Sequence, residues 1–156
     1  MKKQTIELTK SEYISILKAV YLGAWMANAH RIDDVKEEYE SAEKLMLSLA
    51  SQFGCLKYVD RDEKTNKLYP SVELEGGEPE ELRADYNEAT FWSELTAKLG
   101  AQLFAKRYSE AEIKKMDEDD HFAKLYECID LYADEFEEFG LENINCPKLE
   151  KLHCKK

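Results

Sequence analysis

The apolar residues in the stretch 122–139 recur at gaps that alternate between three and four, and carboxylates crowd the positions between them. The apolar positions are Phe122, Leu125, Ile129, Tyr132, Phe136 and Phe139. Because an α-helix makes one turn in about 3.6 residues, this spacing places all of these side chains on one stripe. Gly140 follows as the expected C-terminal cap. The pattern predicts an amphipathic helix whose stripe packs into the core and whose other side is acidic.

Two capping boxes mark the starts of further helices. Thr9-Lys10-Ser11-Glu12 has the hydroxyl and the glutamate that satisfy each other's orphan amides at a helix N-terminus. The helix that follows, to about Met26, is apolar around almost its whole circumference, so we expect it in the middle of the core. Ser109-Glu110-Ala111-Glu112 repeats the signature and predicts a short helix.

Helical spacing also predicts two long helices, over about 34–53 and about 80–107. Gly54 is expected to end the first of them, and Pro79 suits the first turn of the second. Gly100 interrupts the second apolar run, so we expect a bend or break there.

Between these two helices the period changes. Leu56-Lys57-Tyr58-Val59 and Leu68-Tyr69-Pro70-Ser71-Val72 flank a polar stretch, which indicates a two-stranded hairpin with Pro70 on an edge strand. The predicted fold class is therefore mainly α: a single-domain helical bundle of about five helices, with a small β-hairpin between the second and the third. We expect an acidic helical domain over residues 1–145 and a Lys-rich C-terminal tail over 146–156.

Charge is strongly segregated. The chain has 22 basic and 33 acidic side chains, a formal net charge of -11. Residues 109–142 alone hold thirteen acids against three lysines, a local net of -10. Direct binding to nucleic acid or to an anionic membrane would need the opposite sign, so the expected partner is a protein with a basic surface.

The acidic side of the last helix is the candidate partner-binding surface, made by Asp120, Glu127, Asp130, Asp134, Glu137 and Glu138. Three interpretations fit it. It is a solvated face that keeps the protein in solution, a docking face for a basic partner, or a mimic of a nucleic-acid backbone that inhibits a nucleic-acid-binding protein. A non-enzymatic interaction module or inhibitor is the preferred hypothesis, and the mimic is its alternative.

A small-ligand or metal-dependent enzyme is a further alternative. Trp25, Asn28 and His30 end the first helix and form a candidate pocket, although such a histidine more often satisfies helix carbonyls. Glu118 and His121 have the Glu-x-x-His spacing of di-iron bundles, but those sites need the motif twice. We therefore predict no metal site, no catalytic residue and no cofactor.

Cysteine spacing, the length of apolar runs and the N-terminal residues indicate which class of protein this is and where it is located. None of the four cysteines, Cys55, Cys128, Cys146 and Cys154, forms a zinc-like pair, and Cys128 is expected as a small apolar side chain within its helix. No apolar run approaches the roughly 18 residues that a membrane span needs. The N-terminus begins with basic residues, as a signal peptide does, but Glu7 stands where the apolar stretch of a signal peptide would be. We therefore expect a cytoplasmic protein. The high content of aromatic residues is also compatible with a homodimer.

Overall fold

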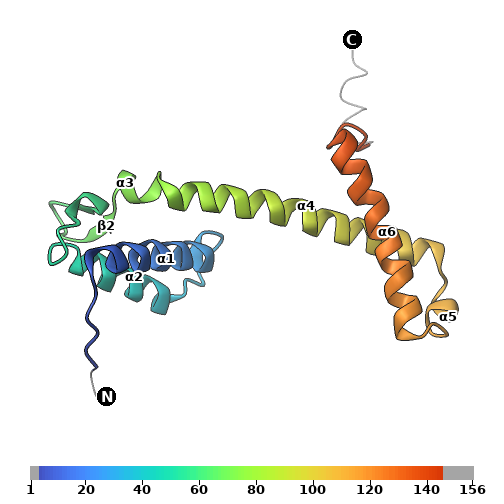
Figure 1. Ribbon diagram of the computed structural model, residues 1–156, viewed down its shortest axis with the longest axis horizontal. Helices are drawn as coiled ribbons and strands as arrows, with labels where there is room; N and C mark the ends of the chain where they lie inside the picture. The colour runs from blue at the N-terminus through green and yellow to red at the C-terminus, as the bar shows by residue number, and fades with distance from the viewer. Residues whose placement is uncertain (1–3, 146–156) are drawn as a thin grey trace, which may run out of the picture. The chain divides into compact units, whose positions relative to one another are not determined.

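The computed structural model describes residues 4–145, and it is mainly helical with a two-stranded antiparallel hairpin after the second helix, which confirms the predicted fold class (Figure 1). The elements are α1 (Lys10–Asn28), α2 (Glu37–Leu49), a 3-10 turn (Leu56–Tyr58), β1 (Val59–Arg61), β2 (Leu68–Pro70), α3 (Val72–Glu75), α4 (Glu78–Arg107), α5 (Glu110–Ile113) and α6 (Glu118–Phe139). The chain divides into two compact units, residues 1–86 and 87–156, and α4 continues from the first into the second. The predicted Lys-rich tail, 146–156, lies outside the described residues.

Helix α1 begins as its capping box predicts. The amide of Glu12 donates to Thr9 Oγ1 at 3.3 Å, and the amide of Thr9 donates to Glu12 Oε2 at 2.8 Å. The side chains that α1 buries are Tyr13, Leu17, Tyr21 and Ala24. Ile16 and Met26 on the same helix are exposed, so α1 packs through one side and does not lie in the middle of the core as expected.

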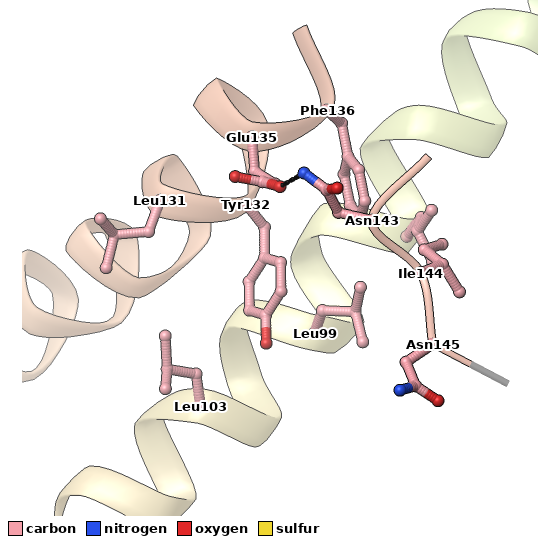
Figure 2. Close-up of a pocket in the computed structure, with 10 residues that line it drawn as sticks. Leu99, Leu103, Leu131, Tyr132, Glu135, Phe136, Asn143, Ile144 and Asn145 are labelled. Atoms are coloured by element: carbon pink, nitrogen blue, oxygen red, sulfur yellow. Dashed lines mark hydrogen bonds between the residues drawn. The ribbon is translucent and has the colours of Figure 1, made fainter. Parts of the chain in front are cut away.

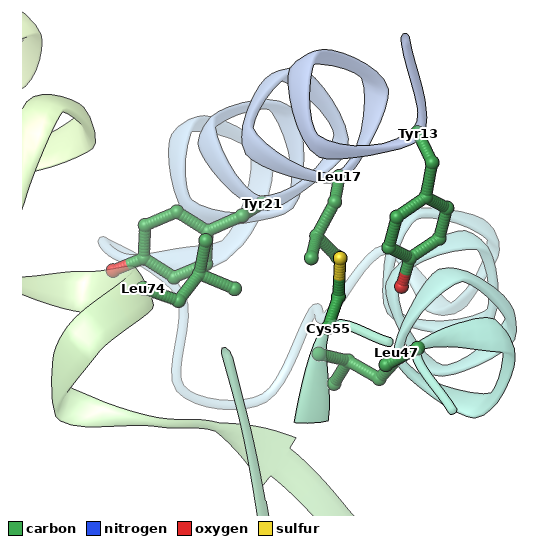
Figure 3. Packing of buried hydrophobic residues seen from close by; sticks show 7 residues of the cluster. Tyr13, Leu17, Tyr21, Leu47, Cys55 and Leu74 are labelled. Atoms are coloured by element: carbon green, nitrogen blue, oxygen red, sulfur yellow. The ribbon is translucent and has the colours of Figure 1, made fainter. Parts of the chain in front are cut away.

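The core of the first unit lies between α1, α2 and the segment from Ala50 to Leu74 (Figure 3). Tyr13 stacks on Phe53 with ring centroids 4.3 Å apart, and its hydroxyl donates to the carbonyl of Met46 at 2.7 Å. A buried hydroxyl is costly unless it is bonded, so this contact fixes Tyr13 in register with α2. Burial also raises the pKa of Tyr13 to about 12.

Helix α2 is shorter than predicted. Its regular hydrogen bonding ends at Leu49, and turns carry the chain on to Gly54, which adopts a positive φ of 62°. Gly54 is therefore where the chain reverses, but it is five residues beyond the helix end. The predicted hairpin forms, with Val59 opposite Pro70 and Arg61 opposite Leu68. Its first strand begins only at Val59, the last residue of the predicted strand, because Leu56–Tyr58 forms a 3-10 turn.

The second half of the chain follows its local signals closely. Ser109 caps α5 with its capping box, and the Asp117 carboxylate accepts from the Asp120 amide at 2.8 Å to start α6. Gly140, with a φ of 56°, ends α6 as predicted. Helix α4 does not break at Gly100 but is continuous over 30 residues. Within residues 4–145, no helix is both long and apolar enough to cross a membrane.

Candidate functional site

Helices α4 and α6 of the second unit cross at Gly100 and Ile129. A Cβ placed on Gly100 would lie 2.5 Å from Ile129 Cγ1 and 2.7 Å from Ile129 Cα, so the two backbones meet where Gly100 has no side chain. The helices meet around this point and do not run side by side along their lengths. The glycine predicted as a weak point is thus a contact that lets two helices approach closely.

This close approach decides which row of α4 is buried. Thr96, Gly100 and Phe104, spaced by four residues, are buried, and Cys128 is the buried side chain of α6. Thr96 satisfies its hydroxyl within the helix by donating to the carbonyl of Trp92 at 2.9 Å. Because the backbones approach most closely at Gly100, the neighbouring leucines of α4, Leu95, Leu99 and Leu103, lie at the margin of the contact and line an apolar groove beside it.

An apolar groove opens beside the crossing, with a volume of about 570 Å³ (Figure 2). This size falls within the range of about 300–1,000 Å³ that is typical of ligand pockets. Its lining comes from α4, α6 and the turn after α6: Leu95, Leu99, Leu103, Leu131, Tyr132, Glu135, Phe136, Asn143, Ile144 and Asn145. Leu131 and Ile144 are exposed to 46% and 44%, so a large part of this apolar lining faces solvent.

A hydrogen bond holds one wall of the groove in place. After Gly140 the chain turns back, and Asn143 Nδ2 donates to Glu135 Oε1 at 2.6 Å. Figure 2 shows this contact together with Ile144 and Asn145, which border the groove on the side of Leu99. The groove therefore has three walls, formed by α4, α6 and the turn after α6.

The six predicted acidic residues all lie on α6, and five of them are exposed. Asp120 is half-buried and pairs with Lys124 at 2.7 Å, which raises the pKa of that lysine. Glu127 lies 3.7 Å from Arg107. Among residues 4–145, no ion pair involves the remaining members of the set, Asp130, Asp134, Glu137 and Glu138.

The spacing of residues along α6 places several of its acidic side chains next to the groove. Glu127, Leu131, Glu135 and Glu138 follow one another at gaps of four, four and three, which places them along one side of α6. Leu131 and Glu135 line the groove, so carboxylates flank its α6 wall. Glu137 instead lines a smaller hollow, of about 310 Å³, with Trp92 and Phe136.

The apolar stripe predicted for α6 is only partly buried. Phe122 and Phe139 are exposed to 52% and 38%, so the expectation that the whole stripe packs into the core was wrong for these two. A single crossing point cannot cover a helix of 22 residues, which explains why the ends of the stripe are bare. The groove itself was missed by sequence reasoning, and its one available signal was a glycine within an apolar run of α4.

His121 packs against an aromatic ring. Its imidazole meets Phe104 edge-on with ring centroids 5.0 Å apart. Among the described residues, no cluster of three or more His, Cys, Asp or Glu side chains is placed to hold a metal ion. His121 therefore has a packing role at the start of α6, and the absence of a metal remains a prediction.

The region around His30 contains a shallow hollow of about 330 Å³ in the first unit, which Trp25 and Asn28 line with Glu43 and Glu75. His30 is exposed and is not part of it. Both polar atoms of the Asn28 side chain bind the backbone of Lys36, at 2.8 and 3.2 Å, so this amide fixes the loop after α1. Only two of the three predicted pocket residues are brought together.

Cys55 and His30 are not placed for nucleophilic catalysis. Cys55 is buried in the first unit's core, with its Sγ 3.4 Å from the carbonyl of Phe53, whereas His30 is exposed. A thiolate nucleophile needs a basic partner and access to substrate, and Cys55 lacks access.

Comparison with known proteins provides no further constraint on the site. No family model, no curated protein and no solved structure matches this chain.

Proposed function

We propose that this chain is a non-enzymatic protein-interaction module that binds a basic, amphipathic segment of a partner protein. The groove beside the α4–α6 crossing takes the partner's apolar side chains, and the acids of α6 take its lysines or arginines. This is the helix-in-groove type of recognition, in which burial supplies affinity and charge supplies steering.

The observation that carries the proposal is the adjacency of two surfaces. Leu131 faces the apolar groove, while Asp134 and Glu138 lie one and two turns further along α6. Each surface alone has an ordinary explanation, since acidic faces aid solubility and shallow hollows are common. A nucleic-acid mimic would need only the carboxylates, so the groove favours an amphipathic protein over mimicry.

The test uses a fluorescent Lys/Leu peptide designed as an amphipathic helix, with a Lys/Gln peptide of equal length and charge for comparison. Fluorescence anisotropy with the full chain should show tighter binding of the Lys/Leu peptide, and binding that weakens as salt rises. Equal binding of the two peptides would contradict a role for the groove.

Variants separate the contribution of the α6 acids to peptide binding from that of the apolar groove. Asp134→Lys with Glu138→Lys should weaken binding about tenfold, since each exposed ion pair contributes up to about 1 kcal/mol and tenfold is about 1.4 kcal/mol. Asp60→Lys with Glu63→Lys, at exposed positions of the first unit, makes the same change in net charge and should have little effect. Leu131→Gln should reduce binding of the Lys/Leu peptide alone.

A further inference from the structure

The groove beside the α4–α6 crossing has a candidate occupant within the same chain. We propose that the Lys-rich segment 146–156 docks in this groove and against the acids of α6, so that it competes with an external partner. This inference rests on the proposed function, because it assigns a second ligand to the same site.

The described part of the chain ends at the groove. Asn145 is the last described residue, and it lines the groove together with Asn143 and Ile144 (Figure 2). The segment 146–156 is therefore attached to a residue that lines the groove. Eleven residues reach at most about 38 Å when extended, which exceeds the length of α6, about 33 Å for its 22 residues. Every acid of α6 lies within reach.

The composition of the segment 146–156 complements that of the groove. The segment holds four lysines, at 148, 151, 155 and 156, against Glu150 as its one acid. Its two leucines, Leu149 and Leu152, are three residues apart, the spacing that places two side chains on one side of a helical turn. The groove offers the matching surface, with leucines inside and carboxylates along its α6 wall.

Charge distinguishes this occupant from a second copy of the second unit. Residues 87–145 hold fifteen acids against six lysines and arginines, so two such surfaces repel each other. A basic segment attached at the groove has no such penalty, and attachment gives it a high effective concentration. An external partner then binds to the fraction of molecules whose groove is open.

The first experiment locates the segment in the full, unmodified chain. A carbodiimide joins lysine amines to carboxylates that lie in direct contact, and mass spectrometry identifies the linked pairs. We expect links from Lys148 or Lys151 to Glu135, Asp134 or Glu138 in monomeric protein, and their loss at high salt. Links found only in dimeric species, or none to α6, would overturn the inference.

The second experiment measures competition. If the segment fills the groove nine-tenths of the time, Lys148→Glu with Lys151→Glu should strengthen binding of the fluorescent Lys/Leu peptide about tenfold. Lys114→Glu with Lys115→Glu makes the same change in net charge at exposed positions after α5 and should have a much smaller effect. Leu149→Ser with Leu152→Ser, which leaves the charge unaltered, should also strengthen peptide binding.

The outcomes separate the two proposals. If the peptide binds the parent chain and all three variants equally, with dependence on Leu131, the segment is not an occupant and the proposed function stands. If the peptide binds none of them, while carbodiimide links to α6 are absent, the proposed function fails with it.

Discussion

The two units of the chain differ in how their helices meet, and this difference decides what their apolar side chains do. In the first unit α1 and α2 pack along their lengths around Tyr13 and Leu17, both fully buried. In the second, α4 and α6 cross at Gly100, and among residues 87–145 only Thr96, Gly100, Phe104 and Cys128 are buried. Helices packed along their lengths close a core, whereas helices that cross at a point leave grooves.

Truncating a matched pair of leucines tests this comparison and has the largest expected effect. Leu17→Ala empties a fully buried site in the first unit and should cost about 2–5 kcal/mol of unfolding free energy. Leu131→Ala removes a side chain that is 46% exposed and should cost less than about 1 kcal/mol.

Urea unfolding measures both losses, with a different tryptophan for each unit. Trp25 reports on the first unit in a Trp92→Phe background, and Trp92 reports on the second in a Trp25→Phe background. A loss for Leu131→Ala as large as that for Leu17→Ala would show that the groove is closed in solution.

Two glycines in helix interiors should respond to alanine with opposite signs. Gly100→Ala forces a methyl group against the backbone of Ile129 and should destabilise the second unit by about 1–3 kcal/mol. Gly23→Ala in α1 meets no atom within 4 Å and should stabilise the first unit by about 0.5–1 kcal/mol. Thermal unfolding followed by circular dichroism checks both changes. If Gly100→Ala were also stabilising, the close crossing would be wrong.

Alkaline pH should weaken the first unit through Tyr13. Burial raises the pKa of Tyr13 to about 12 in the folded protein, whereas an unfolded tyrosine titrates near 10. Between these values the unfolded chain releases a proton that the folded chain retains. The stabilisation is thus complete below about pH 10 and is lost as pH rises toward 12.

The measurement is the urea midpoint reported by Trp25 from about pH 9 to pH 11. Tyr13→Phe should show a flatter decline over this range. At neutral pH the same variant should lose about 1–3 kcal/mol, because the carbonyl of Met46 loses its 2.7 Å partner. An unchanged slope in Tyr13→Phe would assign the pH dependence to other groups, including Tyr21, whose pKa burial also raises.

The smallest expected effect on stability belongs to the acidic side of α6. Asp130→Asn and Asp134→Asn alter exposed carboxylates that make no ion pair within residues 4–145, so each should change unfolding free energy by less than about 0.5 kcal/mol. Partner binding should nevertheless weaken in both. A variant that lost binding and stability together would indicate that these acids support the helix itself.

Local signals in the sequence predicted most element boundaries. Thr9, Ser109 and Gly140 act at helix ends as expected, because caps depend on a few neighbouring residues. The end of α2 was misplaced because the turns up to Gly54 retain apolar side chains such as Phe53 that pack on the core. Local chemistry there does not distinguish a helix from successive turns.

The candidate site was predicted in part. The acids of α6 were identified because a face of a single helix can be derived from its period. The groove was not, since it depends on where α6 crosses α4, and many crossing points are compatible with the same leucines. Gly100 has two meanings in a sequence, a weak point or a close approach, and only the contact with Ile129 decides between them.

Each unit contains a buried thiol whose rate of alkylation reports how often that unit opens. Cys55 is 1% exposed in the first unit and Cys128 is fully covered in the second, and both are free. An alkylating reagent modifies such a sulfur only when its surroundings open, so the rate at each thiol reports the local opening of one unit. Mass spectrometry of the peptides that contain Cys55 and Cys128 would therefore measure the opening of both units in one sample.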